Sequence, residues 1–254
     1  KSISLWIIMR DSRKGVIMKP YQKDSLESYT LGVFPTLELL THQLPLVKRV
    51  ILSSKSDKNQ GVAKIKEICE KNRIEVIESD KTINKLSKKD NCYAIGVFEK
   101  HETKLNPNKN HVVLVNPGDM GNLGTIIRTM IGFGIEDLAI IRPGVDIFDP
   151  KAVRASMGAM FQIRFHYYDS FEDYLKEHHH HIYCLMLKGA TSIHHIEKKE
   201  PYSVVFGNES SGLPDEFLNY GKSVLIPHTN HIDSLNLSMA LGITLYEFTK
   251  NSFI

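Results

Sequence analysis

Three short apolar segments in the second half of the chain each lead into a stretch rich in small polar residues. The segments are residues 112–115, 203–206 and 223–226, and the polar stretches after them are residues 116–124, 207–214 and 233–240. Short apolar runs of this kind are typical of buried strands in a parallel sheet. Ligands bind at the carboxyl ends of such strands, so we expect the three stretches to form one shared pocket in an α/β domain.

The first polar stretch separates a strand from a helix. Residues 125–133 have helical spacing, and Gly134 is a helix stop signal. A glycine-rich loop before a helix exposes backbone N–H groups, so we expect residues 116–124 to favour an anion such as an RNA phosphate. The glycines follow a GxxGxxG pattern instead of GxGxxG, which argues against a dinucleotide-binding fingerprint.

Two polar side chains in this region are candidates for a site. Arg128 lies six residues after Asn122. An arginine fork binds a phosphate or a carboxylate, and an asparagine amide orients a hydroxyl. The segment is equally consistent with a turn residue at 122 and a surface helix residue at 128, and on its own it does not decide between these interpretations.

A polar segment divides the chain into two parts. Residues 99–110 are charged, contain asparagine and proline, and lack apolar periodicity. Before them we expect helices near residues 32–42 and 61–72 and strands at residues 49–52, 74–77 and 94–98. This alternation predicts a small α/β module at residues 1–105, followed by a larger α/β domain at residues 106–254.

Basic charge is concentrated in the first part. Residues 1–110 contain 21 Lys and Arg against 13 Asp and Glu, whereas residues 111–254 contain 11 against 16. This asymmetry suggests that the N-terminal part binds a polyanion, because neutralised phosphates release counterions. A solvated lysine-rich surface explains the same composition equally well.

The bulk composition narrows the class of protein. The three cysteines are far apart and form no CxxC pair, which argues against a disulfide framework. The opening 15 residues do not form a convincing signal peptide, and no run of eighteen apolar residues suits a membrane span. We therefore expect a soluble, cytoplasmic protein.

The segments NPGDMGNLGTIIRT, VVFGNESSGLP and IPHTNHIDSLNLSMA, together with RASMGAMF at residues 154–161, resemble the motifs of a known family. They are similar, in order and spacing, to those of the SpoU/TrmH branch of the SPOUT RNA methyltransferases. The resemblance covers residues 112–248, and more loosely the N-terminal module, which is similar to a ribosomal-protein-L30-like substrate-binding domain. It implies a mostly parallel sheet with a deep trefoil knot, an exception to the rule that chains do not thread loops.

The resemblance also implies a cofactor and the residues that hold it. The family binds S-adenosylmethionine in the knot, largely through backbone groups. The matching positions are Leu187 and Gly189 in the loop at residues 187–192, Gly207, Ile226 and Leu235.

The catalytic residues that the resemblance implies are Asn122, Arg128, Glu209, Ser234 and Asn236. A sulfonium methyl is already electrophilic, so the enzyme must mainly align a ribose 2′-hydroxyl and ease the loss of its proton. The pKa of arginine is too high for an effective general base. We therefore expect Arg128 to hold the target phosphate and to lower the pKa of the hydroxyl by its charge.

The resemblance implies an RNA 2′-O-ribose methyltransferase that acts as a homodimer through its catalytic domain. We favour ribosomal RNA as the substrate, with transfer RNA or a catalytically silent RNA-binding protein as the alternatives. Ser210 stands where the second motif usually has a glycine, so we expect it to disfavour a positive φ and to remodel the loop slightly. In the last helix, residues 234–248, we expect Leu235, Ala240, Ile243 and Phe248 to be buried, in the core or at a subunit interface.

Two further groups of residues have simpler interpretations. The four histidines at residues 178–181 are a candidate metal chelate, but no outlying ligand pattern accompanies them, so we favour a solvated turn and expect no metal. Aromatic residues at 161–168 are candidates for base stacking, but packing of a strand is the commoner explanation.

Overall fold

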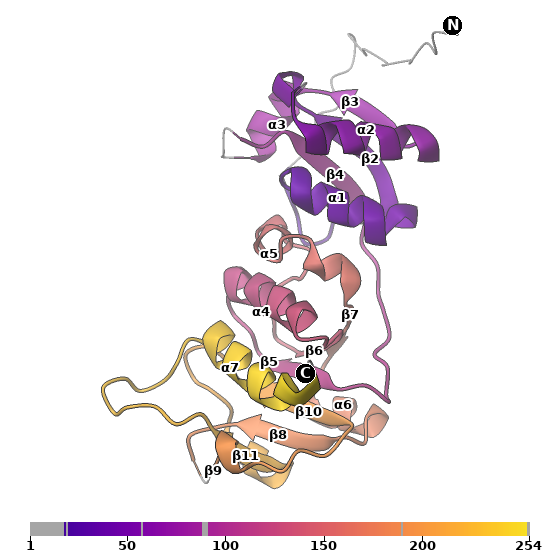
Figure 1. Ribbon diagram of the computed structural model, residues 1–254. Helices are drawn as coiled ribbons and strands as arrows, with labels where there is room; N and C mark the ends of the chain where they lie inside the picture. Colours follow the sequence, from indigo (N-terminus) through magenta and orange to yellow (C-terminus); the bar gives the residue numbers. More distant parts are fainter. Residues whose placement is uncertain (1–17, 19, 57, 88–90, 189, 253–254) are drawn as a thin grey trace, which may run out of the picture. The chain divides into compact units, whose positions relative to one another are not determined.

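A computed structural model of the chain describes residues 18, 20–56, 58–87, 91–188 and 190–252. The N-terminal leader considered above lies outside these residues. The chain divides into two compact units, one formed by Lys1–Lys100 and Phe148–Phe161 and the other by His101–Ile147 and Gln162–Ile254. Each unit has its own sheet (Figure 1).

The first unit is a four-stranded mixed sheet with helices. Its strands are β1 (Glu27–Tyr29), β2 (Val47–Leu52), β3 (Glu75–Glu78) and β4 (Ala94–Glu99), in the order β1-β4-β2-β3. Its longer helices are α1 (Val33–His42), α2 (Gln60–Asn72), α3 (Asp80–Leu86) and α5 (Pro150–Ala155). The predicted strands and helices of the N-terminal module are thereby confirmed to within two residues at each end.

Helix α2 shows how sequence determines packing in this unit. Asn59 caps it, because its side-chain oxygen accepts hydrogen bonds from the N–H groups of Gly61 and Val62. Val62, Ile65 and Cys69 form the buried face. They pack with buried residues of β2 in one apolar cluster, where removing a large aliphatic side chain costs about 2–5 kcal/mol.

Residues 148–161 join the first unit although they lie far along the chain. The rings of Phe148 and Phe161 pack against Phe98 of β4, with centroid separations of 6.3 and 5.1 Å. The Ser28 hydroxyl donates a hydrogen bond to the carbonyl of Phe148. The predicted division at residue 105 did not include this grouping, because aromatic packing between distant segments leaves no local sequence signal.

The second unit is built on a seven-stranded parallel sheet. The strands are β5 (His111–Val115), β6 (Asp137–Ile141), β7 (Arg164–Tyr168), β8 (His181–Leu185), β9 (Thr191–Ser192), β10 (Tyr202–Phe206) and β11 (Lys222–Leu225). Their order is β7-β6-β5-β10-β8-β11-β9, and every neighbouring pair is parallel. The predicted α/β class with a mostly parallel sheet is confirmed. The knot stays a prediction.

Three helices complete this unit, and short 3₁₀ turns occur in both units. The helices are α4 (Met120–Gly132), α6 (Phe171–Glu177) and α7 (Leu237–Thr249), and α4 packs against α7 (Figure 1). The 3₁₀ turns are Leu44–Leu46, Ser54–Ser56, Ala159–Gln162, Ile193–His195, Asp215–Asn219 and Lys250–Ser252. Among the described residues, no helix is long and apolar enough to cross a membrane.

Two local expectations were wrong. Helix α4 begins at Met120 and not near residue 125, because Asp119 caps it by accepting a hydrogen bond from the Asn122 N–H. Two of the glycines that suggested a loop are therefore inside the helix. Helix α7 begins at Leu237 and not at Ser234, because Asn236 caps it. Of the four positions expected to be buried, Phe248 is buried, Leu235 and Ala240 are half-buried, and Ile243 is 39% exposed in the single chain.

The aromatic residues at 161–168 form part of the interior, as expected. Phe161, Phe165 and Tyr168 are at most 5% exposed. The hydroxyl of Tyr167 donates a hydrogen bond to the carbonyl of Val145. In the described structure these rings therefore pack within the protein and are not free to stack on bases.

Candidate active site

A cavity of about 410 Å³ lies at the carboxyl ends of β8, β10 and β11. This volume is in the range of small-molecule sites. Its lining includes Leu187, Gly207, Ile226 and Leu235, four of the five residues predicted to hold the cofactor. The fifth, Gly189, is outside the described residues.

The loop after β10, which lines this cavity, is folded back on itself. A Cβ atom on Gly207 would lie 2.1 Å from the carbonyl carbon of Gly212, so only glycine fits there. Asn208 and Gly212 form an antiparallel bridge, and Gly212 has a φ of 67°. The loop therefore depends on two glycines, one for a close approach and one for a left-handed turn.

Ser210 fits this loop without the strain that we expected. The side-chain oxygen of Asn208 accepts hydrogen bonds from the N–H and the hydroxyl of Ser210, at 2.9 and 2.7 Å. The left-handed φ of the loop falls at Gly212, and Ser210 is not among the described residues with positive φ. The amide nitrogen of Asn208 donates to the carbonyl of Asn116, which ties this loop to the one after β5.

Glu209 is bound at the N-terminal end of α4. One oxygen of its carboxylate accepts a hydrogen bond from the Gly118 N–H at 2.9 Å, and the other accepts from the Asp119 N–H at 3.2 Å. The glycine-rich sequence predicts an anion such as an RNA phosphate at these backbone groups. The structure corrects that prediction, since the anion near the helix N-terminus is a carboxylate of the chain itself.

Asn122 connects Glu209 to the third polar stretch. Its amide nitrogen donates to the second Glu209 oxygen at 3.3 Å, and its own oxygen accepts from the amide nitrogen of Asn236, also at 3.3 Å. The oxygen of Asn236 in turn caps α7 by accepting from the N–H groups of Ser238 and Met239. Three of the five predicted catalytic residues thus form one hydrogen-bonded chain, which fixes which way each amide points.

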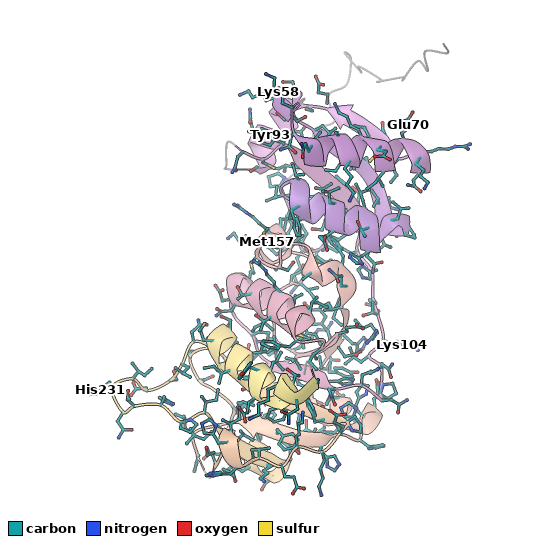
Figure 2. All side chains as sticks on the ribbon, in the orientation of Figure 1. Lys58, Glu70, Tyr93, Lys104, Met157 and His231 are labelled. Carbon is teal, nitrogen blue, oxygen red and sulfur yellow. The ribbon has the colours of Figure 1, made fainter. Side chains whose placement is uncertain are left out.

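The other two predicted catalytic residues lie outside this chain of hydrogen bonds. Ser234 is exposed and lines the cavity. It belongs to the segment between β11 and α7, which extends away from the sheet with His231 near its tip (Figure 2). Arg128 is exposed on α4, and no hydrogen bond or ion pair to another described residue holds its guanidinium. Its charge is therefore available to a ligand.

Sequence reasoning missed two features of the site. Asn208 joins two of the three loops, and its position directly after Gly207 could have suggested an Asx turn. Lys188 and Asp215, which both line the cavity, form an ion pair with each other. No sequence signal indicates this pair, because the two residues are brought together only by the sheet.

The parallel sheet, the cavity at its carboxyl edge and the polar chain beside it define an α/β enzyme that binds a small ligand. A profile of the SpoU rRNA Methylase family matches residues 109–246. A putative tRNA (cytidine(34)-2′-O)-methyltransferase of Listeria innocua is 34% identical over 145 residues, which cover 54% of this chain and 85% of the relative. The 23S rRNA (guanosine(2553)-2′-O)-methyltransferase of Bacillus subtilis is 28% identical, over 50% of this chain and 53% of its own.

A solved structure supports the same family. An rRNA methyltransferase from Sinorhizobium meliloti with bound AdoMet superposes with a TM-score of 0.76 and 25% identity, covering 90% of this chain and 88% of its own. The chain therefore belongs to the SpoU rRNA methylase family, as its motifs suggested. It is an S-adenosylmethionine-dependent RNA 2′-O-ribose methyltransferase.

Proposed function

We propose that the chain methylates the 2′-hydroxyl of a ribose in ribosomal RNA. The observation that carries the proposal is the Glu209–Asn122–Asn236 chain beside the cavity, which links all three polar stretches. In sequence, relatives named for transfer RNA and for ribosomal RNA both align with about half of this chain. In superposition, the structure described for 2′-OH methylation of C/U34 on tRNA covers 56% of this chain, whereas the rRNA methyltransferase of Sinorhizobium meliloti covers 90% of it. The match over both units favours ribosomal RNA.

The cavity suits S-adenosylmethionine in size and lining. Apolar side chains such as Phe206 and Leu237 supply packing, and the loops bearing Leu187, Gly207 and Ile226 supply backbone groups. We assign these residues, with Leu235 and the undescribed Gly189, to holding the cofactor. When bound, it supplies an electrophilic methyl group.

The protein residues then have positioning roles. Glu209 holds Asn122, and Asn122 holds Asn236, so the three loops keep a fixed arrangement before RNA binds. Arg128 binds the phosphate next to the target ribose and lowers the pKa of its hydroxyl by its positive charge. Ser234, at the cavity rim, contributes a hydroxyl for orienting the substrate.

In this proposal, the first unit binds RNA. Its α2 helix and the adjacent loops expose lysines, among them Lys58, Lys64 and Lys71. Multiple phosphate contacts from such residues give salt-dependent binding without sequence specificity. The acidic balance of the second unit is consistent with this division of roles.

A homodimer through the second unit is also part of the proposal. Met239, Ile243 and Tyr246 lie on one face of α7 and are 61%, 39% and 59% exposed. Apolar residues at this spacing on a helix surface suit a self-complementary interface. Sedimentation should show a dimer at micromolar concentration, and a fully active monomer would refute it.

Mapping of 2′-O-methyl groups in RNA from cells with and without the gene tests the substrate. We place the protein in the cytoplasm, where ribosomal RNA and transfer RNA are both accessible. Loss of one methyl group in ribosomal RNA is the expected result. Loss of a methyl group only in transfer RNA would move the substrate to transfer RNA, and unchanged RNA would refute the proposed function.

A further inference from the structure

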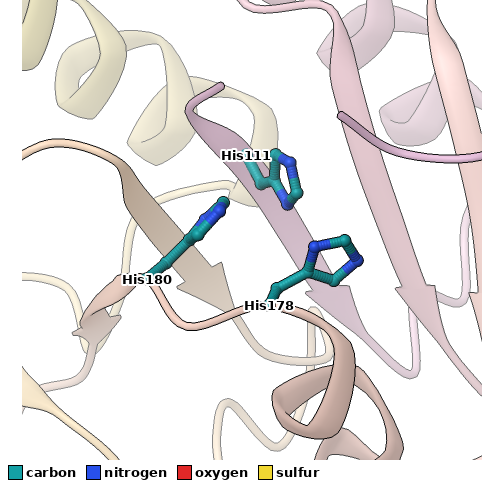
Figure 3. A group of neighbouring side chains, drawn as sticks. All are labelled: His111, His178 and His180. Atoms are coloured by element: carbon teal, nitrogen blue, oxygen red, sulfur yellow. The ribbon is translucent and has the colours of Figure 1, made fainter. Parts of the chain in front are cut away.

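Three histidines converge inside the second unit. His111 is the first residue of β5, His178 directly follows α6, and His180 directly precedes β8 (Figure 3). One ring nitrogen of each lies within 4.8 Å of one from each of the others. His111 is fully buried and His178 is 4% exposed. The expected solvated turn is therefore wrong for His178, and His111 is the neighbouring histidine that sequence alone did not reveal.

The partners of His111 and His180 determine where their protons are. The Nε2 of His111 lies 2.8 Å from the carbonyl oxygen of Asn106, and the Nε2 of His180 lies 2.8 Å from that of Pro107. A carbonyl only accepts hydrogen bonds, so each Nε2 must carry a proton. In the neutral rings, both Nδ1 atoms are then bare lone pairs.

His178 reaches the same state through different contacts. Its Nε2 lies 2.8 Å from the hydroxyl of Tyr168, and that hydroxyl lies 3.2 Å from the Glu177 carboxylate. When Tyr168 donates its proton to the carboxylate, which can only accept, His178 Nε2 is the donor to Tyr168 and Nδ1 is left bare. That buried Nδ1 has no hydrogen-bond partner among the described residues, and the ring faces His111 (Figure 3).

The hydroxyl groups nearby cannot satisfy all of these lone pairs. Tyr174 Oη lies 2.9 Å from His111 Nδ1, and Ser203 Oγ lies 2.8 Å from His180 Nδ1. If each hydroxyl donates to its histidine, no proton remains for the 2.5 Å contact between the two oxygens. His178 Nδ1 receives none either. The cluster thus has more acceptor lone pairs than donated protons. A buried lone pair without a donor costs free energy, and a bound cation would remove that cost.

We propose that His111, His178 and His180 bind one divalent transition-metal cation, with Zn²⁺ the best match. Three neutral imidazoles without a carboxylate suit Zn²⁺ better than Mg²⁺ or Ca²⁺, which prefer oxygen ligands. The bonds from Nε2 to Asn106 and Pro107 are those that typically orient metal-bound histidines. On binding, Tyr174 and Ser203 release the Nδ1 atoms and hydrogen-bond to each other.

The distances between the rings allow all three histidines to bind one cation. At Zn–N bonds of about 2.0–2.1 Å, tetrahedral ligand atoms lie about 3.4 Å apart. The three ring nitrogens lie within 4.8 Å of one another, so a pair must approach by at most about 1.4 Å. Burial lowers the pKa of all three histidines, which keeps them neutral and able to bind at neutral pH. His180 is half-buried, and it offers the cation a route from solvent.

The site is separate from the cavity. His111 and His180 are at the amino ends of β5 and β8, whereas the cavity is at the carboxyl ends of the parallel strands. The cation would join the start of β5, the end of α6 and the start of β8. We therefore assign it a structural role, and methyl transfer should not depend on it.

The test is a zinc titration of the full chain, purified without a histidine tag and treated with chelator, in competition with a chromophoric zinc indicator. We expect binding of about one Zn²⁺ per chain and a higher melting temperature with zinc. His178→Asn should weaken binding at least about tenfold. His179→Asn, which changes the exposed neighbour in the same run, should leave it unchanged.

Equal zinc affinity in the two variants would overturn the proposal and assign binding to surface histidines such as His194 and His195. Absence of zinc binding by the wild type would also overturn it. If His178→Asn does not fold, the wild type decides through ¹⁵N spectra of its histidine rings. Zinc should shift the Nδ1 signals of three histidines, and a shift of Nε2 signals instead would contradict the site.

Discussion

At the scale of single residues, Glu209 explains why the site is preorganised. Its carboxylate accepts hydrogen bonds from two backbone N–H groups at the start of α4 and from the side-chain amide of Asn122. An anion fixed near a helix N-terminus is stabilised by the helix dipole. The arrangement leaves Arg128 as an exposed cation on the same helix, and we assign RNA phosphate binding to it.

Substitution of Arg128 tests that assignment. A lysine keeps the charge but loses the planar fork, so Arg128→Lys should be nearly as damaging as Arg128→Ala. Methyl transfer should fall at least about a hundredfold in both, a barrier increase of about 2.7 kcal/mol. Single-turnover methylation at saturating RNA measures the effect, and S-adenosylmethionine binding is the control.

Near-normal transfer by Arg128→Lys would show that charge alone suffices. Near-normal transfer by Arg128→Ala would remove Arg128 from the chemical step.

The histidine cluster predicts how stability depends on pH in the presence of chelator. Burial lowers the pKa of His111 to about 4 and also lowers those of His178 and His180, despite the nearby carboxylates of Asp137 and Glu177. A depressed pKa means that the unfolded chain binds protons first. The stabilisation is therefore complete above pH 6.5 and is lost as pH falls toward 4, by an amount on the order of 2–3 kcal/mol.

Urea unfolding at pH 7.5 and at pH 5 measures this loss, with His111→Gln as the comparison. A smaller loss is expected for the variant, because one titrating group is removed. An identical loss in the variant and the wild type would show that other groups cause it.

At the scale of elements, the loop after β10 depends on Gly207. An added methyl would collide with the backbone of Gly212 and Leu213, which cannot move aside like a flexible side chain. Gly207→Ala should weaken S-adenosylmethionine binding at least about tenfold, or 1.4 kcal/mol. Gly132→Ala is the matched control, since a methyl there meets no atom within 4 Å.

Calorimetric titration with S-adenosylmethionine gives the affinities of both variants. Wild-type affinity in Gly207→Ala would mean that this loop does not shape the cofactor site.

Much of the second unit could be predicted from sequence at the level of elements. The apolar runs of β5, β10 and β11 and the polar stretches after them are local patterns. As expected, the second and third stretches line one cavity at the carboxyl edge. The first stretch is not in the cavity lining and is joined to the other two only by hydrogen bonds. The start of α4 could not be placed, because the cap by Asp119 competes with glycines that suggest a loop. His111 was missed because a lone histidine at the start of a strand carries no signal of its partners.

At the scale of the whole molecule, the two units are interleaved in sequence. Deletion of residues 1–105 would remove Phe98 and leave Phe148 and Phe161 without their packing partner. In such a truncated protein, a loss of RNA binding could not be distinguished from a loss of folding. Substitutions at the surface separate the two effects.

Charge neutralisation in the first unit should weaken RNA binding and reduce its salt dependence. The variant is Lys58→Gln, Lys64→Gln and Lys71→Gln, and the control in the second unit is Lys104→Gln, Lys109→Gln and Lys222→Gln. Each lost phosphate contact lowers the slope of log affinity against log salt by about 0.7–0.9. Filter binding of RNA at several salt concentrations measures both. A larger loss of RNA affinity in the control would assign RNA binding to the second unit.

Transfer of a labelled methyl group from S-adenosylmethionine to RNA by the purified full chain tests the account most directly. The RNA is digested to nucleosides after reaction, and the position of the label is identified. We predict label in 2′-O-methyl nucleosides, more in ribosomal RNA than in transfer RNA, and almost none with Arg128→Ala. Label on a base, or no transfer by a protein that binds S-adenosylmethionine and RNA, would contradict the account.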